Sequence, residues 1–412
     1  MRIQQLREEL AAGPVEGVLA RFWAEVALVG TPLIEPYDFD HRLVTFLWQQ
    51  QDPVDTVVVI GGPALWWEIP DNQLEHIPGT DVWFRSYVTR ADLRGRYVLS
   101  PNDSLKPLET AGTPAAVERA STFVRDPFNR APFTLPGIPG DPVSPPQHYS
   151  TFALDQATPR LWAEPRPEVP RGEVRETRLS SVALGNERRV WLWQSVPHVA
   201  DPALLVLLDG RDWTEALPIF PTLDNLVAEG LLPPLAAVLP DSIDFATRAR
   251  ELPCHEGFVG FLADELMPWV RERTGVTADP RRTVVAGKSY GGLASVYAGL
   301  RRPDVFGNVI AQSGSFWWTP PGEEAEWLLR QVTTDVPVRF CLDVGLQEGD
   351  WMIPQTQRLA EALTPYAADV LYREYNGGHD LTCWLAELPA ELRWAFKQLG
   401  EPLTAADRAE LQ

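Results

Sequence analysis

The chain is poor in the residues that make disulfide frameworks and metal sites. It has only three cysteines in 412 residues, Cys254, Cys341 and Cys383. An odd and sparse set is not a disulfide framework, and no pair has the Cys-x-x-Cys spacing of a zinc site. The six histidines are scattered along the chain. We therefore expect no structural metal and no cofactor.

The chain also lacks long apolar runs and an excess of positive charge. No segment approaches the roughly 20 apolar residues of a membrane-spanning helix, and the charged first ten residues lack the apolar core of a signal peptide. The net charge is −20, which argues against nucleic acid and anionic membrane surfaces as partners. We expect a cytoplasmic protein without membrane insertion, and assembly of identical chains stays open.

What is present is typical of a globular protein, with 45% hydrophobic and 22% charged residues. The length predicts two domains, or at most three. Residues 2–28 favour one or two helices. Short β-rich segments then follow at 43–48, 56–60, 82–88 and 95–99, separated by turn residues. Their spacing predicts a β-sandwich of immunoglobulin type over residues 1–150.

Prolines recur from Pro127 to Pro170. Because proline breaks helices and removes a ladder donor, we expect neither a helix nor a central strand in residues 126–170. Residues 151–171 are predicted to form an extended linker.

From residue 172 the pattern becomes that of an α/β-hydrolase domain, spanning 172–412. A hairpin at 174–180 and 189–194 leads into buried strands at 204–208, 235–239, 283–286, 308–312, 338–344 and 370–375. The predicted helices lie at 214–230, 257–273, 323–332, 355–363 and 391–399. An antiparallel start followed by a mainly parallel, doubly wound sheet is the plan of that fold. Its site lies beyond the carboxyl ends of the strands.

The central motif is Gly287-Lys288-Ser289-Tyr290-Gly291, which follows a strand and opens a helix. This is the G-x-S-x-G pattern of a nucleophile elbow, and it predicts Ser289 as the nucleophile. Glycines are required because side chains there would strike the adjoining strand and helix. The alternative is a glycine-rich turn with an incidental serine, and the downstream histidine and acids argue against it.

Ser289 needs a base and an orienting acid. His379 follows the last predicted strand in Asn376-Gly377-Gly378-His379-Asp380 and is the predicted base. For the acid, the loop after strand 338–344 favours Glu348. Asp350 ranks second and Asp343 third, because loop length varies after this strand.

The oxyanion donors are predicted to be the backbone N–H groups of Tyr290 and Arg211. The Arg211 guanidinium is left to bind substrate or to sit in solvent. Lys288 has two interpretations of equal weight, an exposed lysine on a turn or a cation beside an anionic substrate.

With these residues placed, the chain resembles the enterochelin (ferric-enterobactin) esterase family. The resemblance is carried by residues 207–210 with Trp213, 250–252, 287–293, 312–318, 343–348 and 377–380 with Trp384. The N-terminal half resembles the family mainly in its texture and in Asp126-Pro127-Phe128-Asn129. Two positions depart from the family pattern: Lys288 stands where glutamine is usual, and His255 where asparagine is usual.

The resemblance implies hydrolysis of the trilactone backbone of a catecholate siderophore, which weakens Fe(III) binding and releases iron inside the cell. Iron would enter only as part of the substrate chelate. The implied substrate-binding residues are cations that meet the charge of the chelate and tryptophans that face its catechol rings: Arg211, Arg248, Arg250, Lys288, Trp213, Trp317 and Trp318.

Two other functions remain to be weighed. One is a serine esterase of the same fold acting on another acyl or aryl ester. The other is a protein that only binds the chelate through its N-terminal domain. The cation-bearing, tryptophan-rich segments argue against the first, and an intact set of Ser289, Glu348 and His379 argues against the second.

Overall fold

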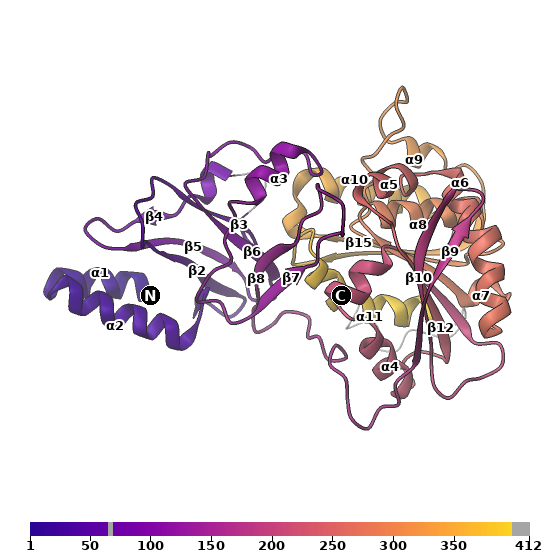
Figure 1. Cartoon of the computed structure of the whole chain (residues 1–412), viewed down its shortest axis with the longest axis horizontal. Coiled ribbons are helices and arrows are strands. Elements are labelled where there is room, and N and C mark those ends of the chain that lie inside the picture. The colour runs from indigo at the N-terminus through magenta and orange to yellow at the C-terminus, as the bar shows by residue number, and fades with distance from the viewer. Residues whose placement is uncertain (65–68, 398–412) are drawn as a thin grey trace. The chain divides into compact units, whose positions relative to one another are not determined.

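The computed structural model describes residues 1–64 and 69–397, which form two compact units (Figure 1). The first unit comprises Met1–Thr158 together with the short segment Asn376–Asp380. The second comprises Pro159–Tyr375 and the chain from Leu381 onward. The domain boundary expected at residue 150 falls inside a strand of the first unit.

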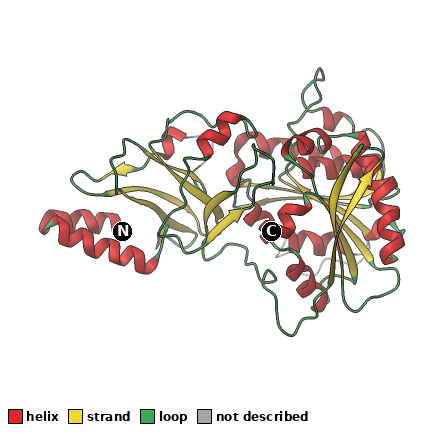
Figure 2. Cartoon of the chain, in the orientation of Figure 1, coloured by secondary structure: helices red, strands yellow, loops and turns green. Residues whose placement is uncertain are grey.

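The first unit starts with two helices and continues as two antiparallel four-stranded sheets (Figure 2). Its helices are α1 (Arg2–Ala12), α2 (Val15–Val29) and the short α3 (Pro114–Ala120), with a 3-10 turn at Ile69–Asn72. One sheet has the order β1 (Leu33–Pro36), β2 (His41–Gln49), β5 (Val82–Arg90), β4 (Glu75–His76). The other has the order β3 (Val57–Gly61), β6 (Arg94–Pro101), β8 (Gln147–Ala153), β7 (Pro132–Leu135).

Side chains from both sheets fill one core. The Phe46 ring of β2 lies 4.7 Å from the Tyr97 ring of β6 and 6.0 Å from the Phe152 ring of β8, measured between centroids. Successive strand residues point to opposite faces, so the neighbouring Leu47 packs with Phe22 of α2 in a second cluster. The predicted β-sandwich is therefore confirmed, with α1 and α2 covering the outer face of one sheet.

The expectation that residues 126–170 hold no central strand is wrong. β8 lies between β6 and β7 in its sheet. Its seven residues contain no proline, so every ladder donor is present, and the strand lies in the proline-free stretch between Pro146 and Pro159. Asp126 and Asn129 are also structural: Asp126 accepts a 2.8 Å hydrogen bond from the Tyr97 hydroxyl, and Asn129 donates to the Thr31 carbonyl.

The second unit is built on one eight-stranded sheet. Its order is β16 (Ala367–Tyr375), β15 (Val336–Gly345), β14 (Asn308–Gln312), β13 (Thr283–Lys288), β11 (Ala203–Leu207), β12 (Leu235–Pro240), β10 (Asn186–Gln194), β9 (Glu173–Ser181). The β9–β10 hairpin is antiparallel to β12, and all other neighbours are parallel. The predicted hydrolase sheet is confirmed.

Helices cover both faces of this sheet. They are α4 (Phe220–Ala228), α5 (Phe245–Glu251), α6 (Glu256–Gly260), α7 (Met267–Thr274), α8 (Tyr290–Arg301), α9 (Trp327–Arg330), α10 (Gly349–Leu363) and α11 (Leu381–Phe396). Short π-helical turns occupy Asp212–Ala216 and Phe261–Leu266, and 3-10 turns occupy Pro280–Arg282 and Leu346–Glu348. Predicted helix 323–332 shortens to α9. Predicted helix 391–399 instead starts at Leu381 and contains Pro389, which sequence rules take as a helix end.

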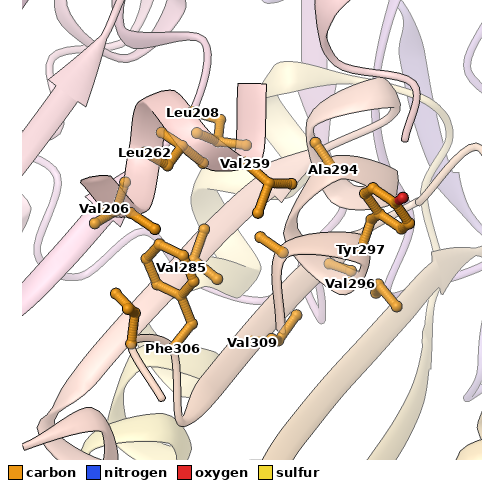
Figure 3. Close-up of a cluster of buried hydrophobic side chains, with 14 of the residues drawn as sticks. Val206, Leu208, Val259, Leu262, Val285, Ala294, Val296, Tyr297, Phe306 and Val309 are labelled. Carbon is orange, nitrogen blue, oxygen red and sulfur yellow. The ribbon is translucent and has the colours of Figure 1, made fainter. Parts of the chain in front are cut away.

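The main core lies on one face of the parallel strands (Figure 3). Val206, Val285 and Val309 come from three adjacent strands and meet Val296 of α8 and Val259 of α6. α11 contacts β13 and β14 but contributes nothing to this cluster, so it covers the other face. The sheet is thus buried on both sides, as parallel sheets require. Among the described helices, none has the length and apolar character of a membrane span.

Candidate active site

Ser289 stands between β13 and α8 in a strained backbone conformation. Its φ is 56° and its ψ −122°, a left-handed region that non-glycine residues rarely adopt. Backbone bonds hold the strain: the Ser289 N–H donates to the Gln312 carbonyl at 2.9 Å, and the Ser315 N–H donates to the Ser289 carbonyl at 3.1 Å. The Ser289 hydroxyl lies 3.4 Å from that of Ser315. This is the backbone that a nucleophile elbow needs.

The elbow glycines are required by space. A Cβ on Gly287 would lie 2.4 Å from the carbonyl carbon and oxygen of Gly291. A Cβ on Gly292 would lie 3.0 Å from the Cα of Gly314. The turn therefore packs backbone against backbone at Gly287, where the predicted reason for the glycine is confirmed. At Gly291, the other glycine of the motif, a Cβ would instead lie 3.2 Å from the side-chain atom Asp209 Oδ2.

Glu348 is buried just after β15, the place where the sequence predicts the acid. Its Oε1 accepts hydrogen bonds from the Ser313 hydroxyl, from the Gly345 N–H at 2.9 Å and from the Tyr375 hydroxyl at 3.3 Å. The Trp384 indole N–H donates to the Ser313 hydroxyl at 2.9 Å. The loop after β14 therefore contacts both the predicted acid and the predicted nucleophile. Ser313 bonds to Glu348, and Ser315 lies against Ser289.

The two lower-ranked acids lie in different environments. Asp350 is exposed in the first turn of α10. Asp343 is buried within β15, where its Oδ1 accepts the Ser313 N–H at 3.1 Å. Burial raises the pKa of Asp343 to about 6, and the pKa of the neighbouring Glu391 is raised as well. Of the three carboxylates, Glu348 is the one that is both buried and outside the sheet.

His379 is half-buried in the loop between β16 and α11. That loop belongs to the first compact unit, whereas Ser289 and Glu348 belong to the second. At its two ends, Asn376 accepts a 3.2 Å hydrogen bond from the Arg94 N–H, and Asp380 lies 3.9 Å from Arg96. The assignment of His379 as the base remains a prediction from chain order.

The charges beneath the elbow are paired. Lys288 is only 4% exposed, so the interpretation as an exposed lysine is wrong. Its ammonium lies 2.6 Å from Asp212 Oδ2 and 3.4 Å from Asp209 Oδ2. Arg248 binds both oxygens of Asp209 at 2.8 Å. Burial alone would raise the pKa of Asp209, but the charges of Arg248 and Lys288 outweigh it and hold that pKa well below its usual range.

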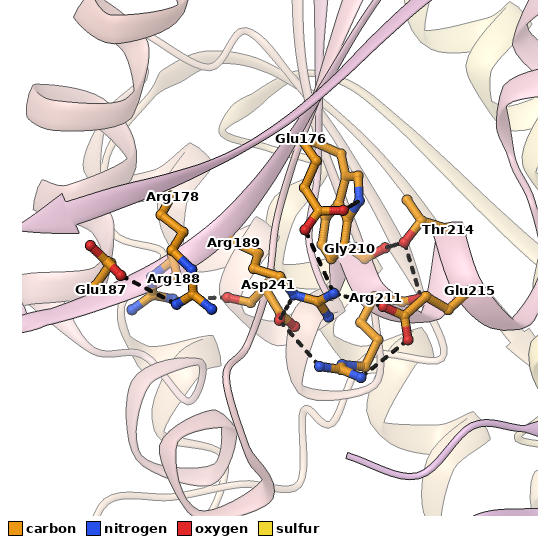
Figure 4. Close-up of polar contacts among 11 residues, drawn as sticks. Glu176, Arg178, Glu187, Arg188, Arg189, Gly210, Arg211, Thr214, Glu215 and Asp241 are labelled. Atoms are coloured by element: carbon orange, nitrogen blue, oxygen red, sulfur yellow. Dashed lines mark hydrogen bonds and ion pairs between the residues drawn. The ribbon is translucent and has the colours of Figure 1, made fainter. Parts of the chain in front are cut away.

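The predicted oxyanion donors both lie at helix beginnings. Tyr290 is the first residue of α8, and such N–H groups have no acceptor within their own helix. Arg211 leads into the π-helical turn Asp212–Ala216. Its guanidinium donates to Glu215 at 3.1 Å and lies 3.8 Å from Asp241, as Figure 4 shows. It is therefore ion-paired, and neither a solvated group nor a free cation.

The three tryptophans that were predicted to face the substrate differ in their exposure to solvent. Trp213 is fully buried, and its indole N–H donates to the Leu208 carbonyl at 3.1 Å, so the prediction that it faces substrate is wrong. Trp318 is half-buried and packs against the core. Trp317 is 38% exposed, and its ring lies 6.0 Å from Tyr290 and 5.6 Å from Trp351, between centroids. Trp351 is 47% exposed and was not predicted, because only tertiary folding brings it to Trp317.

Arg250 and His255 contact residues that are close to them in sequence. The Arg250 side chain is 60% exposed and lies 3.3 Å from Glu251. His255 caps α6, with its Nδ1 accepting the Phe258 N–H at 3.1 Å. Asparagine is also a preferred cap, so this departure from the family pattern keeps the structural role. Within residues 1–64 and 69–397, no group of three or more potential ligands is arranged to hold a metal ion.

Comparisons with known proteins cover both units. Residues 181–395 match the family model of putative esterases, and residues 43–162 match the N-terminal model of enterochelin esterases. The iron(III) enterobactin esterase of Dickeya dadantii is 34% identical, and the match covers 97% of each chain. The iron(III) salmochelin esterase of Escherichia coli is 29% identical, over 94% of this chain and 95% of its own.

A solved structure agrees with these matches. The enterobactin esterase of Shigella flexneri, crystallised in the presence of enterobactin, has a TM-score of 0.74 and 28% identity. The match covers 91% of this chain and 97% of that one.

Proposed function

The chain belongs to the enterochelin esterase family, and from this premise we propose that it hydrolyses the ester bonds of the trilactone backbone of a catecholate siderophore. It is an ester hydrolase. The observation that carries the proposal is the strained Ser289 at the strand–helix turn, in a chain of which 97% matches an iron(III) enterobactin esterase.

In the proposed reaction, His379 takes the proton of the Ser289 hydroxyl as its oxygen attacks a backbone ester carbonyl. The N–H groups of Tyr290 and Arg211 stabilise the oxyanion. The C–O bond then breaks, and the leaving alkoxide takes the proton from the imidazolium. Water attacks the acyl-enzyme with the same proton transfers and frees a carboxylate. Glu348, held by Ser313, orients the imidazole and stabilises its positive form.

Substrate binding is proposed to centre on exposed aromatic rings near the nucleophile. Trp317 and Trp351 contact each other, and Trp317 contacts Tyr290, the residue directly after Ser289. Catechol rings stack favourably on such side chains. Among the predicted cations, Arg250 is the most exposed, whereas the charge of Lys288 is already balanced by Asp209 and Asp212. We assign Arg250 the anionic part of the ligand.

We extend the proposal to iron release in the cytoplasm. Its support is the sparse, odd set of three cysteines, which is not a disulfide framework and suits a reducing compartment. Opening the trilactone separates the catechol arms, which weakens their joint hold on Fe(III), and iron enters only with the substrate.

The test is product analysis with the purified protein. Ferric and iron-free enterobactin are incubated with wild type and with Ser289→Ala, and dihydroxybenzoylserine is measured by mass spectrometry. We expect release by wild type and a loss of at least 10³-fold, roughly, in the variant. Turnover of p-nitrophenyl esters without trilactone cleavage would favour an esterase for other acyl or aryl esters. Undiminished cleavage by Ser289→Ala would remove the nucleophile assignment.

A further inference from the structure

The loop that carries His379 has unusual packing. The chain enters it from β16 and leaves it into α11, and both elements belong to the second unit. The loop itself, Asn376–Asp380, belongs to the first unit by its own contacts. Residues of the first unit therefore hold the loop in place.

Three contacts to the loop come from one short stretch, the turn before β6 and the first residues of that strand. The Arg94 N–H donates to the Asn376 carbonyl at 3.2 Å. The Asn376 side-chain amide donates to Asp92 Oδ1 at 2.6 Å. At the other end of the loop, Arg96 Nε lies 3.9 Å from Asp380 Oδ1. Both ends are held, and His379 lies between them.

The anchoring residues are themselves fixed. β6 is an interior strand between β3 and β8, so its backbone is bonded on both sides. The Arg96 guanidinium carbon lies 4.2 Å from the centre of the Tyr149 ring, and the Arg96 side chain is only 14% exposed. Asn376 and Asp380 are buried. The anchors therefore form a rigid platform.

The loop needs such a platform because of its sequence. Gly377 and Gly378 precede the histidine, and glycines give a free loop many conformations. Ordering such a segment costs conformational entropy, which the contacts at both ends offset.

We propose that Asp92, Arg94 and Arg96 are positioning residues for His379, because they hold both ends of the loop that carries it. This inference rests on the proposed function, which assigns His379 as the base. A misplacement of about 1 Å at a catalytic group costs on the order of 100-fold in rate. Loosening the loop should therefore lower kcat and leave KM nearly unchanged.

The experiment compares Asp92→Ala with the conservative Asp92→Asn in the full chain. Asparagine keeps an oxygen that accepts the Asn376 amide proton, whereas alanine does not. We expect Asp92→Ala to lower kcat for ester hydrolysis about tenfold or more with KM within about threefold, and Asp92→Asn to stay near wild type. Asp155→Ala is the matched control, since it removes an ion-paired carboxylate of the same unit, bonded to Arg42, and should leave kcat unchanged.

A double-mutant cycle with Asn376→Ala isolates the contact. If the two side chains act through each other, the double variant loses little more than either single variant. Arg96→Ala against Arg96→Lys tests the other end of the loop in the same way and serves if Asp92→Ala does not fold. Histidine side-chain NMR, with six signals expected from the composition, should show a change confined to His379.

The outcomes separate the two proposals. Wild-type activity that is lost in Ser289→Ala, together with wild-type kcat in Asp92→Ala and Arg96→Ala, overturns the positioning role and leaves the esterase proposal standing. If wild type cleaves no ester, the proposed function fails. The His379 NMR signals then still decide whether Asp92 and Arg96 hold the loop.

Discussion

Lys288, the neighbour of the nucleophile, lies 2.6 Å from Asp212 in a buried ion pair. The pair joins the end of β13 to the turn after β11, which carries the predicted oxyanion donor Arg211. The other predicted donor, Tyr290, begins α8 two residues after Lys288. Arg248 and Asp209 complete a group of two cations and two anions beneath the elbow. The positive charge of Lys288 is therefore balanced inside the protein by Asp209 and Asp212.

Removing this cation should destabilise the fold. Lys288→Met leaves Asp212 without its partner, and loss of one member of a buried pair is costly. Because Asp212 is partly exposed, we expect about 2 kcal/mol of lost unfolding free energy, and about 1 kcal/mol for Lys288→Gln, whose amide still donates. Urea unfolding measures both. Arg250→Ala, which removes an exposed cation of α5, is the control and should change stability by less than about 0.5 kcal/mol.

Glu348 and Asp350 should behave very differently in catalysis. Glu348→Gln keeps the shape of the buried side chain but removes the charge that favours an imidazolium, so kcat should fall on the order of 10³-fold or more. Asp350→Asn, at an exposed helix position, should stay within about twofold of wild type. Steady-state kinetics on one trilactone decides between them. A larger loss for Asp350→Asn would reverse the ranking of the acids.

Trp351→Ala should weaken substrate binding without weakening the fold. The ring is half exposed and contacts Trp317, so its loss removes a stacking surface worth about 1 kcal/mol, or roughly fivefold in KM. Phe39→Ala, an aromatic of the first unit that is even more exposed, is the control. The comparison uses a catechol-bearing ester and a plain acetate ester. An equal rise of KM for both would contradict an aromatic-ring site.

Stability should respond to pH through Asp343. Its pKa is raised from an ordinary 3.8 to about 6 by burial, so the folded state binds a proton that the unfolded state has lost between these values. Stability is therefore lost as pH rises from 3.8 towards 6, by about 3 kcal/mol for a pKa shift of this size. Asp343→Asn removes the titrating carboxyl group and, with it, this loss of stability at higher pH. The variant should gain unfolding free energy over wild type at pH 8 and lose the gain near pH 4, as urea titrations at both pH values will show.

Much of the fold can be predicted from local patterns in the sequence. Apolar β-branched runs such as Val284-Val285 mark strands buried on both faces, and every predicted strand of the second unit is present. The exceptions arise where a local rule meets tertiary context. Proline density hid β8, whose own residues contain none, and Pro389 hid the first half of α11, which packing stabilises despite the proline.

By itself the sequence determined the fold class and the elbow, because the spacing of glycines around Ser289 and the alternation of strands and helices are local properties. Only the tertiary structure decided which side chains are buried. Trp213 and Lys288 look like surface contacts in the sequence, and both are buried. The tertiary structure also decided which residues hold the His379 loop, because Asp92 and Asn376 are far apart in sequence and meet only when the chain is folded.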